Sequence, residues 1–371
     1  MPSSCRIAYF AHSLRSDWNN GNAHFLRGLA RSMAAMGHDI TIWEHSSGWS
    51  AQNLSQESRG KESLHQFETT YPELHIHTYD DEQLNSSSFW HDALADRQIV
   101  ILHEWNPPDL ANTLLNLKQQ LGFRLLFHDT HHRASSSPDQ IRLFNIARFD
   151  GVLAFGDALR RIYLDQFKID RVWTFHEAAD TSVFQPHPGM AKTSDVVWIG
   201  NWGDGERSED ICEFLLRPAM ALREYRFNVF GVRYPPSGLA ALQSAGVRYR
   251  GYLPNLDAPS AYAASRITVH IPRQQYTIAM HGIPTIRVFE ALACGIPLIS
   301  APWDDAEHLF RKGDIVFAEN TVEMKRAMRR LLSDRQAAEQ QALQGLETIL
   351  SNHTCTHRAQ QLTSICEDLL Q

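Results

Sequence analysis

Residues 281–297 have the spacing of a short helix that could bind a nucleoside diphosphate. Pro284 suits the first helical position, where its missing N–H is no loss, and Gly295 suits the position just past the end. Free N–H groups at the start of such a helix attract phosphate. Glu290 comes six residues after Pro284, about 9 Å along the helix axis, where its carboxylate would reach a ribose next to that diphosphate. Arg287 shares this helix face and could neutralise phosphate, unless the two residues form only a surface ion pair.

A glycine-rich stretch after the apolar residues 196–199 is the second candidate for phosphate binding. It reads Gly200-Asn201-Trp202-Gly203-Asp204-Gly205-Glu206-Arg207. Its glycines would let the backbone approach a ligand closely, and Arg207 could bind a diphosphate through its guanidinium. The stretch fits neither the dinucleotide fingerprint nor the P-loop pattern. A plain strand-to-helix turn is the alternative interpretation.

Other positions expected to contact the nucleotide lie at strand ends or helix starts. Tyr252 precedes an expected helix and could stack on the base, or it could fill a turn as a buried aromatic residue. Arg273 follows an expected strand and should lie at the same site. The full set of predicted binding residues is Gly21, Gly200, Asn201, Trp202, Arg207, Tyr252, Leu253, Arg273, Pro284, Thr285, Ile286, Arg287 and Glu290.

The densest cluster of histidines follows an apolar run and contains His128, Asp129 and His131. A neighbouring expected strand ends in His103 and Glu104. Imidazole and carboxylate both ligate zinc, but the spacing lacks an obvious closing ligand, so no metal site is predicted. We expect instead that the strand ends bring these side chains together, where one carboxylate or imidazole could take a proton from a substrate hydroxyl. Polar loop residues near a helix start would give the same pattern.

The composition is that of a globular protein with room for two domains. The chain has 371 residues, of which 43% are hydrophobic and 21% charged. Its net charge of −7 gives no broad attraction to nucleic acid or to an anionic membrane. No apolar run approaches membrane-spanning length, and the N-terminus lacks a signal-peptide core. Five scattered cysteines suggest a reducing compartment, so a cytoplasmic location is predicted.

Strand and helix patterns alternate along the first half of the chain, as a parallel βαβ sheet requires. A helix is expected from about residue 22 to 36. Residues 46–68, rich in Ser, Gln and Glu, are expected to form an exposed loop or an irregular helix. Compact apolar runs predict strands at residues 7–11, 40–43, 99–102, 124–127 and 151–155.

The pattern breaks in a Pro- and Gly-rich stretch at residues 185–193 and then restarts. The final residues, 353–371, again have helical spacing. Ligands of parallel α/β sheets bind outside the carboxyl ends of the strands, so the predicted site is a cleft between the two halves. Strands of the second half are expected at residues 196–199, 227–231, 267–271 and 298–300.

Residues 289–297, Phe-Glu-Ala-Leu-Ala-Cys-Gly-Ile-Pro, resemble the donor-site signature of the group-1 GT-B glycosyltransferases. They look most like the branch related to spore-maturation glycosyltransferase-like proteins. Residues 20–29 and 176–186 are similar to that family's N-terminal glycine loop and pre-linker segment. In this family the Glu of the signature binds the nucleotide ribose, so the resemblance gives Glu290 that role. The family usually has a second Glu eight residues earlier, where this chain has Gly282. Contacts to the donor sugar from that position, and a retaining mechanism, are therefore not implied.

The resemblance implies an α/β fold with two Rossmann-like domains facing a central cleft. Residues 1–185 would form the acceptor-side domain and residues 186–352 the donor-side domain. Residues 353–371 would form a C-terminal helix that crosses back and packs on the N-terminal domain.

The expected activity is that of a hexosyltransferase-type glycosyltransferase. It would move a sugar from a UDP- or GDP-sugar to a hydroxyl of a glycan, lipid-linked or protein acceptor, with no required cofactor. Arginines and two helix N-termini would neutralise the leaving diphosphate without a metal. Two alternatives stay open: a sugar-nucleotide 2-epimerase of the same architecture, and a nucleotide-sugar-binding module that has lost catalysis. Peripheral membrane contact and the oligomeric state are also left open.

Overall fold

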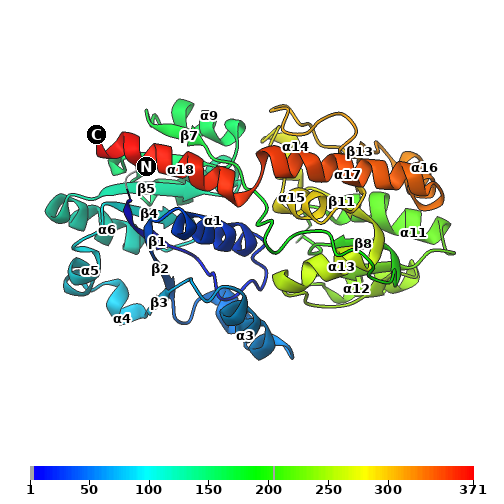
Figure 1. Ribbon diagram of the computed structural model, residues 1–371, viewed down its shortest axis with the longest axis horizontal. Helices are drawn as coiled ribbons and strands as arrows, with labels where there is room; N and C mark the ends of the chain where they lie inside the picture. The colour runs from blue at the N-terminus through cyan, green and yellow to red at the C-terminus, as the bar shows by residue number, and fades with distance from the viewer. Residues whose placement is uncertain (1–3, 204) are drawn as a thin grey trace. The chain divides into compact units, whose positions relative to one another are not determined.

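The computed structural model describes residues 4–203 and 205–371, which form two α/β units (Figure 1). The first unit comprises Met1–Glu177 together with Cys355–Gln371, and the second comprises Ala178–Thr354. Asp204 of the glycine-rich stretch lies outside the described residues.

The chain passes between the units after Glu177 and after Thr354, whereas the sequence placed the boundaries after residues 185 and 352. The difference has a local cause, because the two crossings pair with each other inside the second unit. Ala179 and Thr354 form a parallel bridge, and the Ala179 N–H donates to the carbonyl oxygen of His353 at 3.0 Å.

The first unit is built on a sheet of parallel strands in the order β3-β2-β1-β4-β5-β6-β7. The central strands are buried along almost their whole length, which explains their continuous apolar runs. The predicted parallel sheet is confirmed. Its strands are β1 Arg6–Phe10, β2 Asp39–His45, β3 Ile76–Tyr79, β4 Ile99–His103, β5 Arg124–Asp129, β6 Gly151–Ala154 and β7 Val172–Thr174.

Helices connect these strands. Two of them, α2 and α3, occupy most of the stretch whose composition predicted an exposed loop or irregular helix. They form there because Leu54 and Phe67 are apolar and buried in the unit. The helices are α1 Ala23–Ala35, α2 Trp49–Leu54, α3 Gly60–Thr70, α4 Asp81–Leu84, α5 Ser87–Leu94, α6 Pro108–Leu121, α7 Arg133–Ser136, α8 Pro138–Arg142, the 3₁₀ helix η1 Ile146–Arg148 and α9 Asp157–Asp165.

The last helix of the chain, α18 Cys355–Leu370, packs on α1 within the first unit (Figure 1). Its buried face carries Leu362, Ile365 and Leu369 at helical spacing. A polar contact fixes its position, because Thr363 Oγ1 lies 2.9 Å from His38 Nε2 just after α1. The prediction that the C-terminal helix crosses back to the N-terminal domain is confirmed.

The second unit has its own parallel sheet, in the order β10-β9-β8-β11-β12-β13. Its strands are β8 Ser194–Ile199, β9 Phe227–Phe230, β10 Arg248–Tyr249, β11 Ser265–His270, β12 Leu298–Ser300 and β13 Val316–Phe317. Its helices are α10 Ser208–Ile211, the π-helical turn η2 Cys212–Leu216, α11 Arg217–Ala221, α12 Pro236–Ser244, the 3₁₀ helix η3 Asn255–Asp257, α13 Ala258–Ala263, α14 Gln274–Ile278, α15 Ile286–Ala293, α16 Thr321–Ser333 and α17 Arg335–Asn352.

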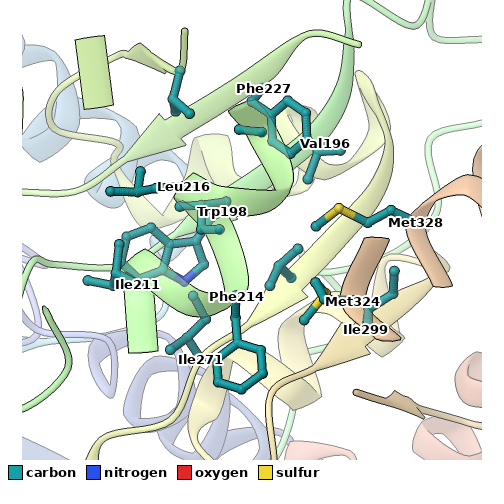
Figure 2. Packing of buried hydrophobic residues seen from close by; sticks show 14 of the residues in the cluster. Val196, Trp198, Ile211, Phe214, Leu216, Phe227, Ile271, Ile299, Met324 and Met328 are labelled. Atoms are coloured by element: carbon teal, nitrogen blue, oxygen red, sulfur yellow. The ribbon is translucent and has the colours of Figure 1, made fainter. Parts of the chain in front are cut away.

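The core of the second unit joins its central strands to the helices beside them (Figure 2). Val196 and Trp198 of β8 pack in one cluster with Phe214 of η2 and Met328 of α16. The π-helical turn precedes Pro218, which has no N–H to continue an α-helical ladder. None of the described helices is long and apolar enough to cross a bilayer.

Candidate functional site

The helix predicted to bind phosphate is α15, and it begins two residues later than the sequence indicated. Its first residue is Ile286, and Thr285 caps it with extended backbone (φ −81°, ψ 158°). Pro284 is buried ahead of the helix, so its predicted place at the first helical position was wrong. The start is set by tertiary contact, because Thr285 Oγ1 lies 3.0 Å from Nε2 of His270 on β11. Gly295 follows the helix end with φ +63°, as predicted for a terminating glycine.

Glu290 lies on α15 with a fully buried carboxylate. Its Oε2 accepts a hydrogen bond from Nη1 of Arg287 at 2.5 Å, and the Tyr262 hydroxyl donates to it as well. The exposed fractions of the two charged side chains are 0% for Glu290 and 27% for Arg287. The pair is therefore not a simple surface ion pair, and Arg287 is the member that a ligand can reach. The contact of Glu290 with a ribose stays a prediction.

His270 joins three elements at this place. Its Nδ1 lies 2.9 Å from Ser300 Oγ on β12, and its Nε2 lies 3.0 Å from Thr285 Oγ1 at the cap of α15. Burial, helped by the nearby Arg207 guanidinium, lowers the pKa of His270 to about 3. The ring is thus neutral at pH 7 and holds the start of α15 through hydrogen bonds alone. The sequence analysis did not single out His270; its only signal was a histidine at the end of an apolar strand.

The glycine-rich stretch packs tightly on the turn after β9. A Cβ on Gly200 would lie 2.6 Å from the Trp198 ring, and a Cβ on Gly231 would lie 2.2 Å from the carbonyl oxygen of Gly200. Asn201 Oδ1 accepts the Val232 N–H at 2.9 Å. Two backbones therefore touch here, and this contact alone requires the small residues.

Trp202 belongs to the hydrophobic core, where it is 9% exposed. A Cβ on Gly238 would come within 2.8 Å of its ring, so the structure gives Trp202 a packing role, and its ligand contact stays a prediction. Tyr252 and Leu253 are half-buried and follow Gly251, which has φ +75°. Gly21 is half-buried in the turn before α1.

Two arginines leave an excess of positive charge beside the glycine-rich stretch. Arg273 Nη1 donates to Glu206 Oε2 at 2.8 Å. Arg207 Nη1 donates to the Ile271 carbonyl oxygen at 3.1 Å, and its Nε has no hydrogen-bond partner among the described residues. Burial and the neighbouring Arg273 lower the pKa of Arg207 to about 10, so it is still a cation at pH 7. Two guanidiniums with one carboxylate suit an anion that accepts several hydrogen bonds.

The predicted catalytic residues lie at the carboxyl ends of β4 and β5 in the first unit. Glu104, His128 and Asp129 are each 0% exposed, whereas His131 is half-buried. Only His131 among the four is therefore accessible to a substrate hydroxyl. Their catalytic roles stay predictions, and the structure gives three of them buried partners.

The two buried carboxylates have separate partners. Asp129 Oδ2 accepts from the Tyr163 hydroxyl at 2.6 Å, and its Oδ1 accepts the His131 N–H at 2.9 Å. Burial raises the pKa of Asp129 to about 6. Glu104 is ion-paired with Arg133. Burial and the neighbouring Asp129 carboxylate raise the pKa of Glu104, against the opposing pull of Arg133.

The imidazoles of this cluster are neutral at pH 7. Burial lowers the pKa of His128 to about 3, and burial with neighbouring basic groups lowers the pKa of His103 well below its usual value. The Tyr9 hydroxyl lies 2.6 Å from His128 Nδ1, and Thr130 Oγ1 lies 3.0 Å from His103 Nε2. The remaining ring nitrogens, Nε2 of His128 and Nδ1 of His103, have no hydrogen-bond partner within the described part of the chain.

Sequence reasoning missed several residues that complete these clusters. Thr130 and Arg133 follow the histidine cluster directly, so their proximity in sequence was the available signal. Tyr163 and Tyr262 come from helices far along the chain, and nothing local marks them. No three His, Cys, Asp or Glu side chains within residues 4–203 and 205–371 are grouped so that they could hold a metal ion.

Residues 207–364 match the family model described as "Glycosyl transferase-like". This region begins at Arg207 and contains both Arg273 and α15. No match to the chain was found among curated protein sequences. The assignment to the branch related to spore-maturation proteins stays a prediction.

Solved structures with the same fold span almost the whole chain. HepE from Anabaena, in complex with UDP and glucose, has a TM-score of 0.71 at 13% identity, covering 98% of this chain and 99% of that chain. A glycosyltransferase from Rickettsia africae has a TM-score of 0.68 at 11% identity, covering 100% and 99%. Sucrose-phosphate synthase from Thermosynechococcus elongatus has a TM-score of 0.67 at 15% identity, covering 98% and 99%. By the family match of its C-terminal region and by its fold, the chain is a glycosyltransferase of the GT-B type, in the group-1 class.

Proposed function

We propose that this protein transfers a sugar from a nucleoside diphosphate sugar to an acceptor hydroxyl, with the donor bound by the second unit. The observation that carries the proposal is the pair Arg207 and Arg273, which share the single carboxylate of Glu206 and leave Arg207 Nε unpaired among the described residues. A diphosphate would supply the missing negative charge. Structures of HepE, which has a similar fold, contain UDP and UDP-glucose, so a uridine nucleotide is the first donor to test and a guanosine nucleotide the second.

The start of α15 would complete the donor site. The N–H groups at Thr285 and Ile286 would bind phosphate oxygens, because the first N–H groups of a helix lack partners within it. Arg287 would add a cation, held in place by the buried Glu290 carboxylate. Glu290 would also accept hydrogen bonds from the ribose, as the resemblance implies, and Tyr252 and Leu253 would contact the base.

The reaction asks for little beyond charge and position. The bond between the sugar and the diphosphate breaks with its electron pair on the diphosphate, and the acceptor oxygen forms the new bond to the sugar and loses its proton. The arginines would stabilise the leaving diphosphate without a metal. His131 is the predicted catalytic residue that a hydroxyl can reach, while Glu104, His128 and Asp129 would position the groups around it.

Calorimetric titration with UDP and GDP tests the donor site. Arg273→Ala should weaken the binding of the preferred nucleotide by about 10- to 100-fold, which is about 1.5–3 kcal/mol for a hydrogen bond to a charged group. Arg223→Ala, at an exposed arginine of the same unit, should leave the affinity unchanged. Equal affinities in wild type and Arg273→Ala would overturn the assigned site.

Incubation with UDP-glucose or GDP-mannose, with and without a chelator, tests the reaction. A transferase releases free nucleoside diphosphate, slowly to water and faster when an acceptor is present, and it does so with chelator. An epimerase would instead return a sugar nucleotide with inverted C2. A binding module would take up the nucleotide and release no sugar. Either of the last two results would overturn the proposal.

A further inference from the structure

Trp105 is an exposed aromatic residue held in a rigid turn between β4 and α6. It is 40% exposed, whereas the residues on either side, Glu104 and Asn106, are 0% and 6% exposed. The Glu104 N–H donates to the carbonyl oxygen of His128 at 2.9 Å, and the Asn106 N–H donates to that of His103 at 3.0 Å. The backbone that carries the indole is therefore fixed on both sides.

The indole ring is also fixed directly. The Arg133 guanidinium carbon lies 4.1 Å from the ring centroid, and Arg133 is anchored by its ion pair with the buried Glu104. The His131 ring lies 4.8 Å from the indole at an interplanar angle of 68°. The His12 ring lies 6.2 Å away at 45°. A cation and two imidazoles thus surround an indole that still has a large accessible area.

This surrounding distinguishes Trp105 from an ordinary exposed apolar residue. A single exposed hydrophobic side chain needs no explanation, but this one is immobilised by polar groups that themselves rest on buried charges. It lies at the carboxyl end of β4 beside that of β5, the edge at which parallel α/β sheets bind their ligands. Burial and the nearby Arg133 lower the pKa of His12 to about 4, so His12 offers a neutral donor and acceptor at pH 7.

A pyranose ring matches these features. One of its faces presents C–H groups, which pack on the negative face of an aromatic ring, and its edge presents hydroxyl groups that pair with neutral donors and acceptors. A lipid chain would leave the imidazoles unpaired, and a charged acceptor would find no free counter-charge at His12. The site therefore favours a neutral sugar.

We propose that Trp105 is the platform of an acceptor subsite, on which a neutral sugar ring stacks while His12 and His131 bind its hydroxyl groups. The role as acceptor rests on the function proposed above, whereas sugar binding at Trp105 does not. The acceptor class is then a carbohydrate, or a molecule that ends in one, rather than a bare lipid or a protein side chain.

Saturation-transfer NMR with the methyl glycosides of glucose, galactose, mannose and N-acetylglucosamine tests the platform directly. The full chain should saturate the C–H protons of at least one of these sugars. Trp105→Ala should abolish that signal, and Trp105→Phe should retain part of it because an aromatic face remains. Trp49→Ala is the matched control, since Trp49 is 45% exposed in the same unit and packs edge-on against Trp18. It should leave the signal unchanged.

The same variants separate this proposal from the proposed function. Trp105→Ala should keep the UDP affinity and the slow hydrolysis of UDP-glucose, and it should raise the KM for the sugar that gave the NMR signal at least tenfold. No saturation with any of the four sugars, or an equal loss in Trp49→Ala, would overturn the platform. A loss of UDP-glucose hydrolysis in Trp105→Ala would move Trp105 to the donor side and also overturn it. Failure of UDP to bind the wild type would refute the proposed function and leave the NMR result standing.

Discussion

The carboxylate of Glu290 is buried between Arg287 and Tyr262, so its replacement affects folding and ligand binding by different routes. Glu290→Ala removes an acceptor from two donors and should lower the free energy of unfolding by about 1–3 kcal/mol. Glu290→Gln keeps an acceptor of the same shape for the Tyr262 hydroxyl and should be less destabilising. If Glu290 binds the ribose, Glu290→Gln should still weaken UDP binding at least tenfold in calorimetry.

The two variants therefore distinguish a ligand contact from a structural role. A stable Glu290→Gln protein with wild-type UDP affinity would leave Glu290 with its structural role alone. The resemblance by itself would have predicted that Glu290→Ala folds normally, because it places the carboxylate on a ligand. The burial of Glu290 changes that expectation.

The buried ring of His270 makes the stability of the protein depend on pH. Burial lowers the pKa of His270 to about 3 in the folded state, whereas the unfolded value is about 6.5. Below about pH 6.5 the unfolded chain takes up a proton that the folded chain refuses, so this group lowers the free energy of unfolding by about 1.4 kcal/mol for each pH unit down to about pH 3.

Urea unfolding of wild type and His270→Asn at pH 7, 6, 5 and 4 checks this sign and size. The variant starts from a lower stability because it loses a hydrogen bond, and its free energy of unfolding should fall less steeply with acid. The gap between the two proteins should close by about 3 kcal/mol between pH 6.5 and pH 4. Parallel curves would contradict the assignment.

At the same scale, the sequence identified residues whose signal is local and missed those whose partners are distant. Arg287 and Glu290 lie three apart on one helix, so their pairing was predictable from spacing. Tyr262 reaches the same carboxylate from another helix, and His270 joins three elements. Such contacts depend on tertiary packing, which no spacing within one segment encodes.

At the scale of elements, the predicted strands correspond to observed ones because buried parallel strands are continuous apolar runs. The start of α15 was misplaced because a proline suits the first helical position in general, while here Thr285 is held by His270 and becomes the cap. Polar composition likewise hid α2 and α3, whose few apolar residues are enough to dock them. Tertiary contacts decided both cases.

The close approach of two turns in the second unit gives a prediction at this scale. A Cβ on Gly231 would lie 2.2 Å from the Gly200 carbonyl oxygen, so Gly231→Ala must push the glycine-rich stretch away from β9. We expect a loss of about 1–3 kcal/mol in the free energy of unfolding and weaker UDP binding. Denaturant titration and calorimetry measure the two effects.

Gly48→Ala is the control for this substitution. A Cβ there would meet its nearest atom, the His45 carbonyl oxygen, at 3.6 Å, which is an ordinary contact. Its stability and UDP affinity should equal those of wild type. A Gly231→Ala protein as stable as Gly48→Ala would show that the two turns can separate without loss.

At the scale of the whole molecule, each unit has its own sheet and its own core, and the chain enters the first unit twice. The second entry is α18, which follows the entire second unit in sequence and yet packs on α1. Stability of the first unit therefore depends on residues more than three hundred positions away, such as Thr363 against His38. The resemblance predicted this crossing, whereas the helical spacing of residues 353–371 predicted only a helix.

A substitution in α18 should consequently weaken the first unit and leave the second intact. Leu362 is 1% exposed, and Leu362→Ala should cost about 2–5 kcal/mol. Hydrogen exchange measured by mass spectrometry should show faster exchange in β1, β4 and α1, with β8 and β11 unchanged. Leu343→Ala on α17, at a leucine that is 66% exposed, should change neither set. Faster exchange of β8 and β11 in Leu362→Ala would mean that the units unfold together, because only a shared transition carries the loss of a contact in one core to the strands of the other.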